Sequence, residues 1–374
     1  MTRSSIRGLG LVSSIVILSG CGSMGHASQA KHGSSPNKVS SSRKSSKPTP
    51  TKKSSPAAKA GGSAAKKGGT TSKTGPSSSK KLMTLGFWSH HKSLPATSLG
   101  MSGHSLTAIS PFWYSLTASG TLKSQVDMPL LAEARKLHIA ITPLVNDATG
   151  TQAFLTSTAT QTRAVQSIDH MIATMHFQGV NIDFEPPHTH LKSALTAFMV
   201  KLRDQLPRSD SITIDVVPHS GGAYDFPKLA PEVNQFAIMT YDEHSDGTPA
   251  GPVAALNWVT SIASRMKSAV PSSKIDLGVA LYGYYWAAGS THAVTVPYAS
   301  ITPAMKAKAT WNSRYQEMTA HIGSDVYWWE NRKGVAQKIA LAKKDHLAGI
   351  AMWQVGYANG AIYSELLKNI GKQP

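Results

Sequence analysis

The chain has 374 residues and a formal net charge of +18. Residues 1–81 hold 15 of its 38 basic residues and no acidic residue, so residues 82–374 keep 23 basic against 20 acidic residues. The excess charge lies in a low-complexity tail without interleaved aromatic residues, which argues against a nucleic-acid-binding protein.

The first 21 residues, MTRSSIRGLGLVSSIVILSGC, have the build of a secretory signal peptide. Two arginines precede an apolar run of about a dozen residues, which is too short for a membrane span of roughly 20 residues. Cys21 is the only cysteine, which excludes an internal disulfide. Its place after Leu18-Ser19-Gly20 resembles a bacterial lipobox, which implies lipidation at Cys21 and a membrane-anchored, extracytoplasmic protein. The alternative is an ordinary signal with a chance cysteine at its end.

Residues 22–81 are almost entirely Ser, Lys, Gly, Pro, Ala and Thr. Such a composition cannot bury enough apolar surface to fold, so this segment is predicted to be a disordered basic linker. Polyanionic wall polymers or anionic lipid head groups would attract it. An equally supported interpretation is a linker whose lysines only keep it soluble.

Residues 82–374 are enough for one large catalytic domain with a substantial core. Short apolar runs rich in β-branched and aromatic residues alternate with stretches of helical spacing. The runs predict eight strands, at 82–88, 106–113, 139–145, 179–185, 211–217, 235–241, 275–281 and 348–353. The helical spacing predicts helices at 128–137, 160–175, 191–206, 252–270 and 335–346, whereas 89–105 is too rich in Gly, Ser and His for a good helix.

Eight apolar strands that alternate with helices predict a (β/α)8 TIM barrel, an α/β fold. An open doubly wound sheet is the alternative, but it would want a Gly-rich phosphate loop after an early strand, and the sequence contains none. The stretch 284–330, between strand seven and the last helix, is longer than one helix needs and contains VTVPY and VYWWE. It predicts a small inserted subdomain.

The predicted fourth strand ends in an unusual acidic pattern, GVNIDFEPP. Asp183 and Glu185 are two residues apart, so both lie on one face of the strand. That face is the barrel interior because the apolar Val180, Ile182 and Phe184 face the helices. Pro186 favours an extended Glu185 and fixes the place where the strand ends. Two neighbouring buried carboxyls raise each other's proton affinity, as a general acid requires. A structural ion pair is the alternative, but this strand carries no basic residue.

These residues resemble glycoside hydrolase family 18, whose Asp-Gly-x-Asp-x-Asp-x-Glu motif corresponds to residues 178–185 here. Met239-Thr240-Tyr241-Asp242 looks like the family's Met-x-Tyr-Asp, and Trp353 stands where the family carries a Trp under the reacting sugar. The resemblance spans residues 82–374. Finer features, TLGFW, SPFWY, LYGYYW and VYWWENRKGVAQKIALAKKDHLAGIAMW, look like the branch of spore-germination and cortex-lytic glucosaminidases.

The resemblance implies a substrate-assisted, retaining mechanism in which the sugar's 2-acetamido group is the nucleophile. It implies that Glu185 is the general acid and base, that Asp183 orients the acetamido nitrogen, and that Tyr241 donates to the acetamido carbonyl. Asp242 would support the same pocket and Trp353 would form its floor. The remaining expected substrate contacts are Met239, Asn181, Tyr282 and Trp113. The family uses no cofactor or metal.

The chain departs from the family pattern at two places. Gln178 replaces the first Asp of the motif, and Asn181 replaces the second, although Asn is common there in the branch just named. The missing first carboxylate, at Gln178, puts the charge coupling to Asp183 in doubt. It leaves the proton donor Glu185 in place.

Further polar and aromatic residues stand near predicted strand ends. Each aromatic residue could stack on a flanking sugar, but ordinary packing is favoured for each alone. They are Trp88, Trp113, Tyr114, Tyr282, Tyr284 and Trp286. The spacing of His188 and His190, and of Glu243 and His244, does not satisfy a metal site, and His219 and His244 could line the cleft as hydrogen-bond partners.

The sequence therefore predicts an envelope-anchored, monomeric hydrolase that cleaves β-1,4 bonds at N-acetylglucosamine in peptidoglycan or spore cortex. A chitinase, which differs only in the polymer it accepts, is the second hypothesis. A catalytically inactive sugar-binding relative is the third, and the intact Asp183, Glu185 and Tyr241 argue against it.

Overall fold

The computed structural model describes residues 82–89, 95–102 and 105–370. The predicted signal peptide, the lipidation site Cys21 and the linker 22–81 lie outside these residues. Within them, no helix is both long enough and apolar enough to span a membrane.

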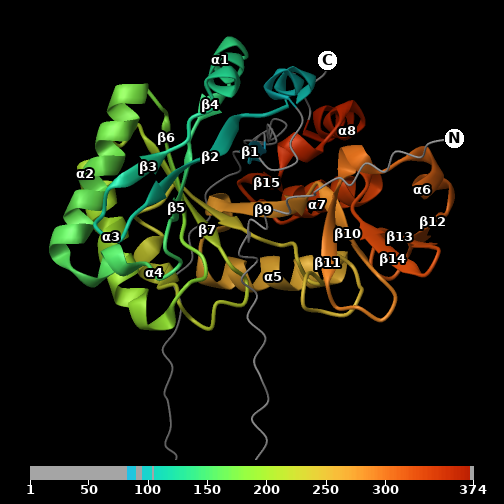
Figure 1. Ribbon diagram of the computed structural model, residues 1–374. Helices are drawn as coiled ribbons and strands as arrows, with labels where there is room; N and C mark the ends of the chain where they lie inside the picture. Colours follow the sequence, from blue (N-terminus) through green and yellow to red (C-terminus); the bar gives the residue numbers. More distant parts are fainter. Residues whose placement is uncertain (1–81, 90–94, 103–104, 371–374) are drawn as a thin grey trace, which may run out of the picture. The chain divides into compact units, whose positions relative to one another are not determined.

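Eight parallel strands close into a barrel, which confirms the predicted fold (Figure 1). The strands follow the order β1, β15, β9, β8, β7, β6, β5, β2, and β2 pairs with β1 to complete the circle. Their bounds are Met83–Trp88 (β1), Ala108–Leu116 (β2), Leu144–Asp147 (β5), Gly179–Asp183 (β6), Ser211–Val216 (β7), Gln235–Ile238 (β8), Ile275–Ala280 (β9) and Gly349–Trp353 (β15).

The predicted third strand, 139–145, is divided in the structure into β4 (Ala140–Ile141) and β5. Pro143 lies at the break, where it has no N–H to donate to the sheet. Its carbonyl still accepts from the Asn181 backbone at 3.0 Å, so the strand remains docked on β6. The short strand β3 (Leu122–Ser124) adds an antiparallel edge to β2.

Helices cover the outside of the barrel. They are α1 (Met128–Lys136), α2 (Thr158–Met175), α3 (Lys192–Gln205), α4 (Phe226–Leu229), α5 (Leu256–Ala269), α7 (Arg332–Lys344) and α8 (Gly360–Ile370). Short 3-10 turns lie at Ala96–Ser102, Ala153–Thr156, Thr189–Leu191, Ser272–Lys274, Tyr298–Ser300 and Val355–Tyr357. Asp127, Ser157 and Asn331 accept from backbone N–H groups at the starts of α1, α2 and α7.

Helix α5 begins at Leu256, four residues later than predicted, because carboxylates hold the preceding backbone extended. Glu317 accepts from the N–H groups of Val253 and Ala254 at 2.8 and 2.5 Å, and Glu243 accepts from Ala255 at 2.9 Å. These N–H groups are therefore satisfied without a further helical turn.

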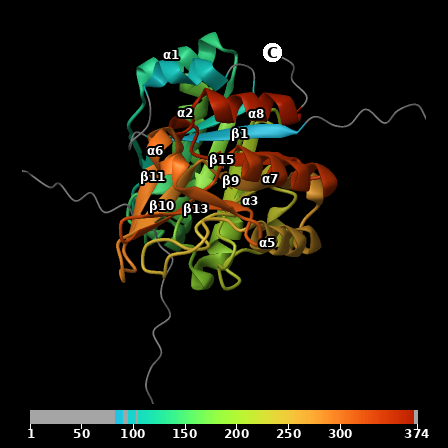
Figure 2. The same cartoon turned by 90° about the vertical axis from the view of Figure 1, so that its right-hand side faces the viewer.

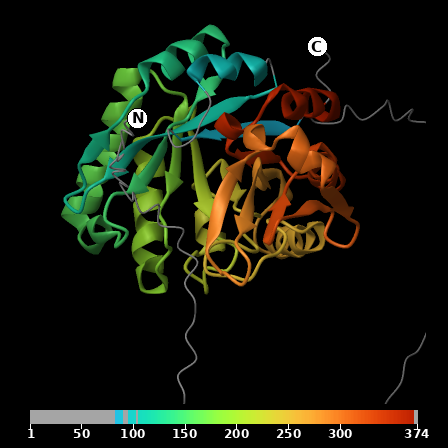
Figure 3. The same cartoon turned by 45° about the vertical axis from the view of Figure 1, so that its right-hand side comes forward.

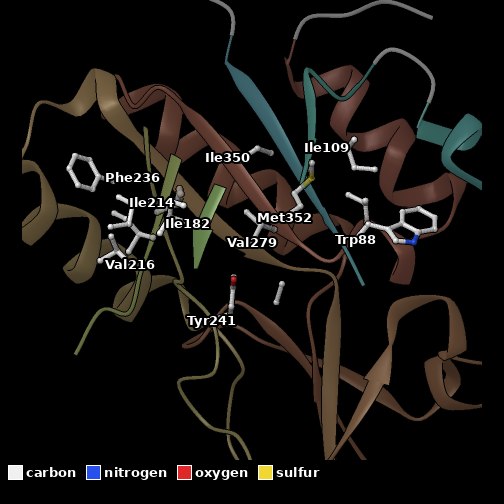
Figure 4. Packing of buried hydrophobic residues seen from close by; sticks show 14 of the residues in the cluster. Trp88, Ile109, Ile182, Ile214, Val216, Phe236, Tyr241, Val279, Ile350 and Met352 are labelled. Carbon is white, nitrogen blue, oxygen red and sulfur yellow. The ribbon is translucent and has the colours of Figure 1, made fainter. Parts of the chain in front are cut away.

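The hydrophobic core lies between the barrel and its helices. Ile182, Ile214 and Phe236 are neighbours in register on β6, β7 and β8 and are fully or almost fully buried, and Figure 4 shows them together on one side of the strands. A smaller cluster fills the barrel interior, with Phe87, Leu144 and Ala237 among its members. The residues that alternate with the outer core therefore face inward, where the polar groups described below also lie.

The predicted insertion between β9 and α7 is confirmed as a five-stranded antiparallel sheet with the order β11, β10, β14, β13, β12. Its elements are β10 (Tyr282–Trp286), β11 (Ala293–Pro297), α6 (Pro303–Ala307), β12 (Ala309–Asn312), β13 (Glu317–Ile322) and β14 (Asp325–Trp329). Figures 2 and 3 show it, in orange, as a distinct layer at one side of the barrel.

A buried ionic cluster joins the insertion to the barrel. Glu330 follows β14 and forms an ion pair with Lys338 of α7, and each side chain is 1% exposed. Glu317 of β13 is fully buried, and Lys338 interacts electrostatically with it as well. The Lys338 ammonium group on α7 thus interacts with two buried carboxyls, Glu317 on β13 and Glu330 just after β14.

Asp276 is a further buried carboxyl, at the start of β9. It is 2% exposed, and its Oδ1 has no hydrogen-bond partner among the described residues. A Cβ atom at Gly349 would stand 2.8 Å from that oxygen, so the glycine leaves the room that the carboxyl occupies. Burial raises the pKa of Asp276 to about 7.

We expect Asp276→Asn to change how stability depends on pH. The folded-state pKa lies above the unfolded value, so wild-type stability falls as pH rises from about 4 to about 7 and then levels. Over roughly three pH units at about 1.4 kcal/mol each, the upper limit is on the order of 4 kcal/mol. The variant should therefore gain stability relative to wild type between pH 4 and pH 8 in urea unfolding. A difference that stays constant with pH would refute the assignment, and the exposed Asp204→Asn is the control.

Candidate active site

Asp183 and Glu185 lie together at the carboxyl end of β6. Asp183 is the last residue of the strand and is 7% exposed, and Glu185 lies two residues further on and is half-buried. The strand ends at Asp183 rather than at the predicted Glu185, before the cis peptide bond between Glu185 and Pro186. A hydrogen bond joins the two carboxyls, and Glu185 is its donor. Such a hydrogen bond requires that at least one of the two carboxyls is protonated.

The electrostatics of the pair favour this protonated form. Burial, followed by repulsion from Asp183, the hydrogen bond and repulsion from Asp242, raises the pKa of Glu185 well above its ordinary value. Burial, followed by repulsion from Asp215, raises the pKa of Asp183 to about 8. The raised pKa favours the protonated form of Glu185, which is the form that a general acid needs.

Asn181 lies below this pair and is fully buried. Its amide nitrogen donates to Ser110 Oγ at 3.1 Å and to Asp215 Oδ2 at 3.0 Å. The sequence predicts that Asn181 contacts substrate, but in the structure its side-chain nitrogen donates to two protein partners and the residue is fully buried. It supports the site from within the barrel.

Gln178 lies outside the site, at the opposite end of β6 from Asp183. It is exposed, its carbonyl accepts from the Ile141 backbone at 2.8 Å, and its amide donates to the His176 carbonyl at 2.8 Å. The residue at this motif position thus joins β6 to β4 and does not touch the carboxyl pair.

Asp215 of β7 is a site residue that our sequence reasoning missed. It is 4% exposed and lies at the level of Asp183 on the neighbouring strand. The run SITIDVV contains the same signal as β6, because Asp215 alternates with the outward-facing Ile214 and Val216. Applying the alternation argument to every predicted strand would have found it.

The segment after β8 brings Tyr241 to the same strand ends. β8 ends at Ile238 rather than at the predicted Tyr241, because Thr240 N–H turns back to the Ile238 carbonyl. Tyr241 is 9% exposed, and Figure 4 shows its hydroxyl turned toward the strands. Burial and repulsion from Asp215, Glu185, Asp242 and Asp183 raise the pKa of Tyr241, so it remains a hydrogen-bond donor. Met239, two residues before Tyr241, is half-buried against the core.

The insertion supplies the partners of Asp242. Tyr282 and Tyr284 of β10 donate to Asp242 Oδ1 at 2.5 and 2.9 Å. Asp242 has a left-handed backbone with φ 62°, and burial raises its pKa despite these two hydrogen bonds. The sequence predicts Tyr282 as a substrate contact and offers Tyr284 as a candidate for sugar stacking, whereas in the structure both hydroxyls donate to Asp242.

Trp353 ends β15 at the mouth of the barrel. It is half-buried, its ring packs on Phe87 at 5.4 Å between centroids, and the peptide bond that follows it is cis. It belongs to the edge of the interior cluster, so an apolar ring is available at this end of the barrel.

Trp113 corrects our expectation. It is 2% exposed and packs against Phe177, with 6.1 Å between ring centroids, in the outer layer of the core. Phe112 contacts the interior cluster instead, and the register of β2 shifts between Phe112 and Tyr114. Trp88 and Tyr114 are likewise part of the outer core, and Trp286 is buried with its Nε1 donating to the Thr248 carbonyl.

The histidines near the strand ends contact nearby protein groups. His188 bonds the Gly150 carbonyl at 3.0 Å, His244 bonds the Pro249 carbonyl at 3.0 Å, and His219 lies 6.2 Å from the Trp258 ring. Among residues 82–89, 95–102 and 105–370, no three His, Cys, Asp or Glu side chains form a group that could hold a metal ion.

Residues 115–358 match the sequence model of glycosyl hydrolases family 18. The chain belongs to glycosyl hydrolase family 18. It is related to spore cortex-lytic enzymes and chitinases.

Among its relatives, the cortical fragment-lytic enzyme of Bacillus anthracis is 24% identical over 279 residues, which cover 67% of this chain and 65% of that protein. The first curated relatives are matched over 61 to 66% of their own length, which is less than two thirds.

Two solved structures are similar in fold. The spore cortex-lytic enzyme SleL of Bacillus megaterium has a TM-score of 0.69 at 21% identity, with 77% of this chain and 74% of that chain covered. A chitinase of Chromobacterium violaceum has a TM-score of 0.68 at 21% identity, with coverage of 78% and 100%.

Proposed function

We propose that this family 18 glycosidase cleaves β-1,4 bonds at N-acetylglucosamine in peptidoglycan or spore cortex by a substrate-assisted, retaining mechanism. The observation that carries the proposal is the pair of neighbouring carboxyls, Asp183 and Glu185, at the carboxyl end of β6, where burial raises the pKa of Glu185. A proton donor beside an acceptor is the pair that such a reaction needs.

Each residue at the strand ends has one role in this mechanism. Glu185 protonates the glycosidic oxygen and then takes a proton from the attacking water. Asp183 accepts the acetamido N–H and stabilises the positive charge that develops as the acetamido oxygen attacks the anomeric carbon. Tyr241 donates to the acetamido oxygen, and its raised pKa keeps the proton available.

Asp242, Met239 and Trp353 shape the pocket. Asp242 is held by Tyr282 and Tyr284, so its position depends on the insertion. Trp353 offers an apolar ring as the floor for the reacting sugar, and Met239 offers an apolar wall. Aromatic rings are suited to the apolar face of a hexose.

The choice of peptidoglycan or cortex rests on the similarity to the cortical fragment-lytic enzyme. A chitinase remains the alternative, because a solved chitinase is about as similar in fold as SleL. We further propose that the enzyme is lipidated at Cys21 and tethered to the cell envelope, supported by the lipobox-like Leu18-Ser19-Gly20 and the basic linker 22–81.

Product analysis tests the proposed substrate. The full-length chain is incubated with peptidoglycan sacculi, spore cortex fragments and N-acetylglucosamine oligomers, and new reducing ends are identified by mass spectrometry. We expect muropeptides that end in reducing N-acetylglucosamine. Cleavage of the oligomers alone would make the protein a chitinase, and cleavage of none of them would refute the proposal.

Removal of the acetyl groups tests the mechanism. We expect chemically de-N-acetylated polymer to be cleaved at least about 10³-fold more slowly than the same polymer after re-acetylation, because the nucleophile is then missing. The re-acetylated sample controls for damage during the treatment. Equal rates on the two samples would contradict acetamido participation.

A further inference from the structure

Asp215 places a third carboxyl in the barrel interior beside the catalytic pair. β6 and β7 are paired in register up to Ile182 and Ile214, so the next residues, Asp183 and Asp215, stand side by side. Strand neighbours are about 4.8 Å apart. Asp215 in turn pairs with Ala237 of β8.

Only one of the two carboxyl oxygens of Asp215 has a hydrogen-bond partner among the described residues. Its Oδ2 accepts from Asn181, which also bonds Ser110, and its backbone carbonyl accepts from the Tyr224 hydroxyl at 3.4 Å. Its Oδ1 and the Oδ1 of Asp183 are both buried and have no partner among the described residues. The two strands thus present unsatisfied carboxyl oxygens at the same level.

Apart from the Asn181 amide, the groups that face Asp215 are titratable acids and phenols. They are Asp183 and Glu185 on β6 and beyond it, Asp276 on β9, Tyr224 before α4, and Tyr241 after β8. No basic side chain of the described residues takes part in this group of interactions. Neighbouring carboxyls without a cation cannot all ionise, so the charge state of each depends on the others.

We propose that Asp215 is a positioning residue for the reaction: it acts through Asp183, placing a like charge behind that carboxyl and holding it toward Glu185. The role rests on the proposed function, in which Asp183 accepts the acetamido N–H. A carboxylate with high proton affinity accepts a stronger hydrogen bond as positive charge develops on that group. Asp215 on β7 is thereby the carboxyl that neighbours Asp183, whereas Asn181 on β6 is an amide and offers no carboxyl there.

The first test measures the coupling without enzyme activity. Aspartate side-chain carbons of the full-length chain are titrated by ¹³C NMR, and the Asp183 signal is assigned by its absence in Asp183→Asn. In Asp215→Asn the Asp183 transition should move to lower pH by on the order of one unit, because a like charge is removed. Thr213→Val, an uncharged change at an inward-facing position of β7, should leave it in place. An unmoved Asp183 transition in Asp215→Asn would overturn the proposal.

The second test joins the coupling to catalysis. On N-acetylated polymer we expect Asp215→Asn to lower kcat about tenfold, to change KM less than twofold, and to move the acidic limb of the pH profile downward. A lower kcat with an unmoved acidic limb would show a merely structural role. If the wild-type chain cleaves no N-acetylated polymer, the proposed function fails, and the NMR titration still decides whether Asp215 acts on Asp183.

Discussion

Glu185→Gln is expected to lower kcat on N-acetylglucosamine polymer by about 10³-fold or more while the chain still folds and binds. Gln has nearly the same shape as Glu but cannot transfer a proton, and general acid catalysis contributes roughly 10²–10⁴-fold. The change also removes one of the mutually repelling carboxyls, so stability should be unchanged or higher. Initial rates and binding to sacculi measure the two effects.

The control for this variant is Glu243→Gln. Glu243 follows Asp242 in sequence and accepts from the Ala255 backbone, a bond that Gln can also accept. Its rate should stay within a few-fold of wild type. If Glu185→Gln kept more than about a tenth of wild-type kcat, another group would have to be the acid.

Lys338→Met should destabilise the protein by about 3–5 kcal/mol at pH 8. The side chain fills a similar volume, but Glu330 and Glu317 lose the cation that both use, and uncompensated buried charges carry a cost of this size. Unfolding by urea with a far-UV signal measures the difference. The exposed Lys344→Met on the same helix should change stability by less than about 0.5 kcal/mol.

The loss in Lys338→Met should shrink at pH 5. Burial raises the pKa of Glu330 to about 8 even with Lys338 present, and it also raises that of Glu317. Carboxyls that are protonated at pH 5 need no cation, so the variant then leaves little charge unpaired. A loss that was equal at pH 5 and pH 8 would contradict this account and would indicate a packing defect instead.

The barrel could be predicted because local pattern decides it. Eight apolar runs alternate with helical stretches, and that order leaves few architectures open. The finer boundaries depend on tertiary contacts. The start of α5 follows from Glu317, which lies more than sixty residues away in sequence, and the break in the third strand follows from a proline whose effect depends on its neighbours.

The candidate site was predictable where one strand carries its own signal. The spacing of Asp183 and Glu185 shows both on one face, whereas Asp215 has no acidic neighbour in its strand and was passed over. Trp113 was assigned to the cleft because strand alternation does not reveal a shift of register within β2. The joint bonding of Tyr282 and Tyr284 to Asp242 appears only when the insertion is folded onto the barrel.

The last strand of the barrel is also the one that closes it. β15 lies between β1 and β9, and Gln354 just after it bonds Ser89 just after β1, 265 positions away in sequence. A chain interrupted before residue 349 would leave β1 and β9 with unpaired edges and no Trp353 floor. A polypeptide that stops before β15 therefore has no closed barrel, and on the proposed function it should not cleave a wall polymer.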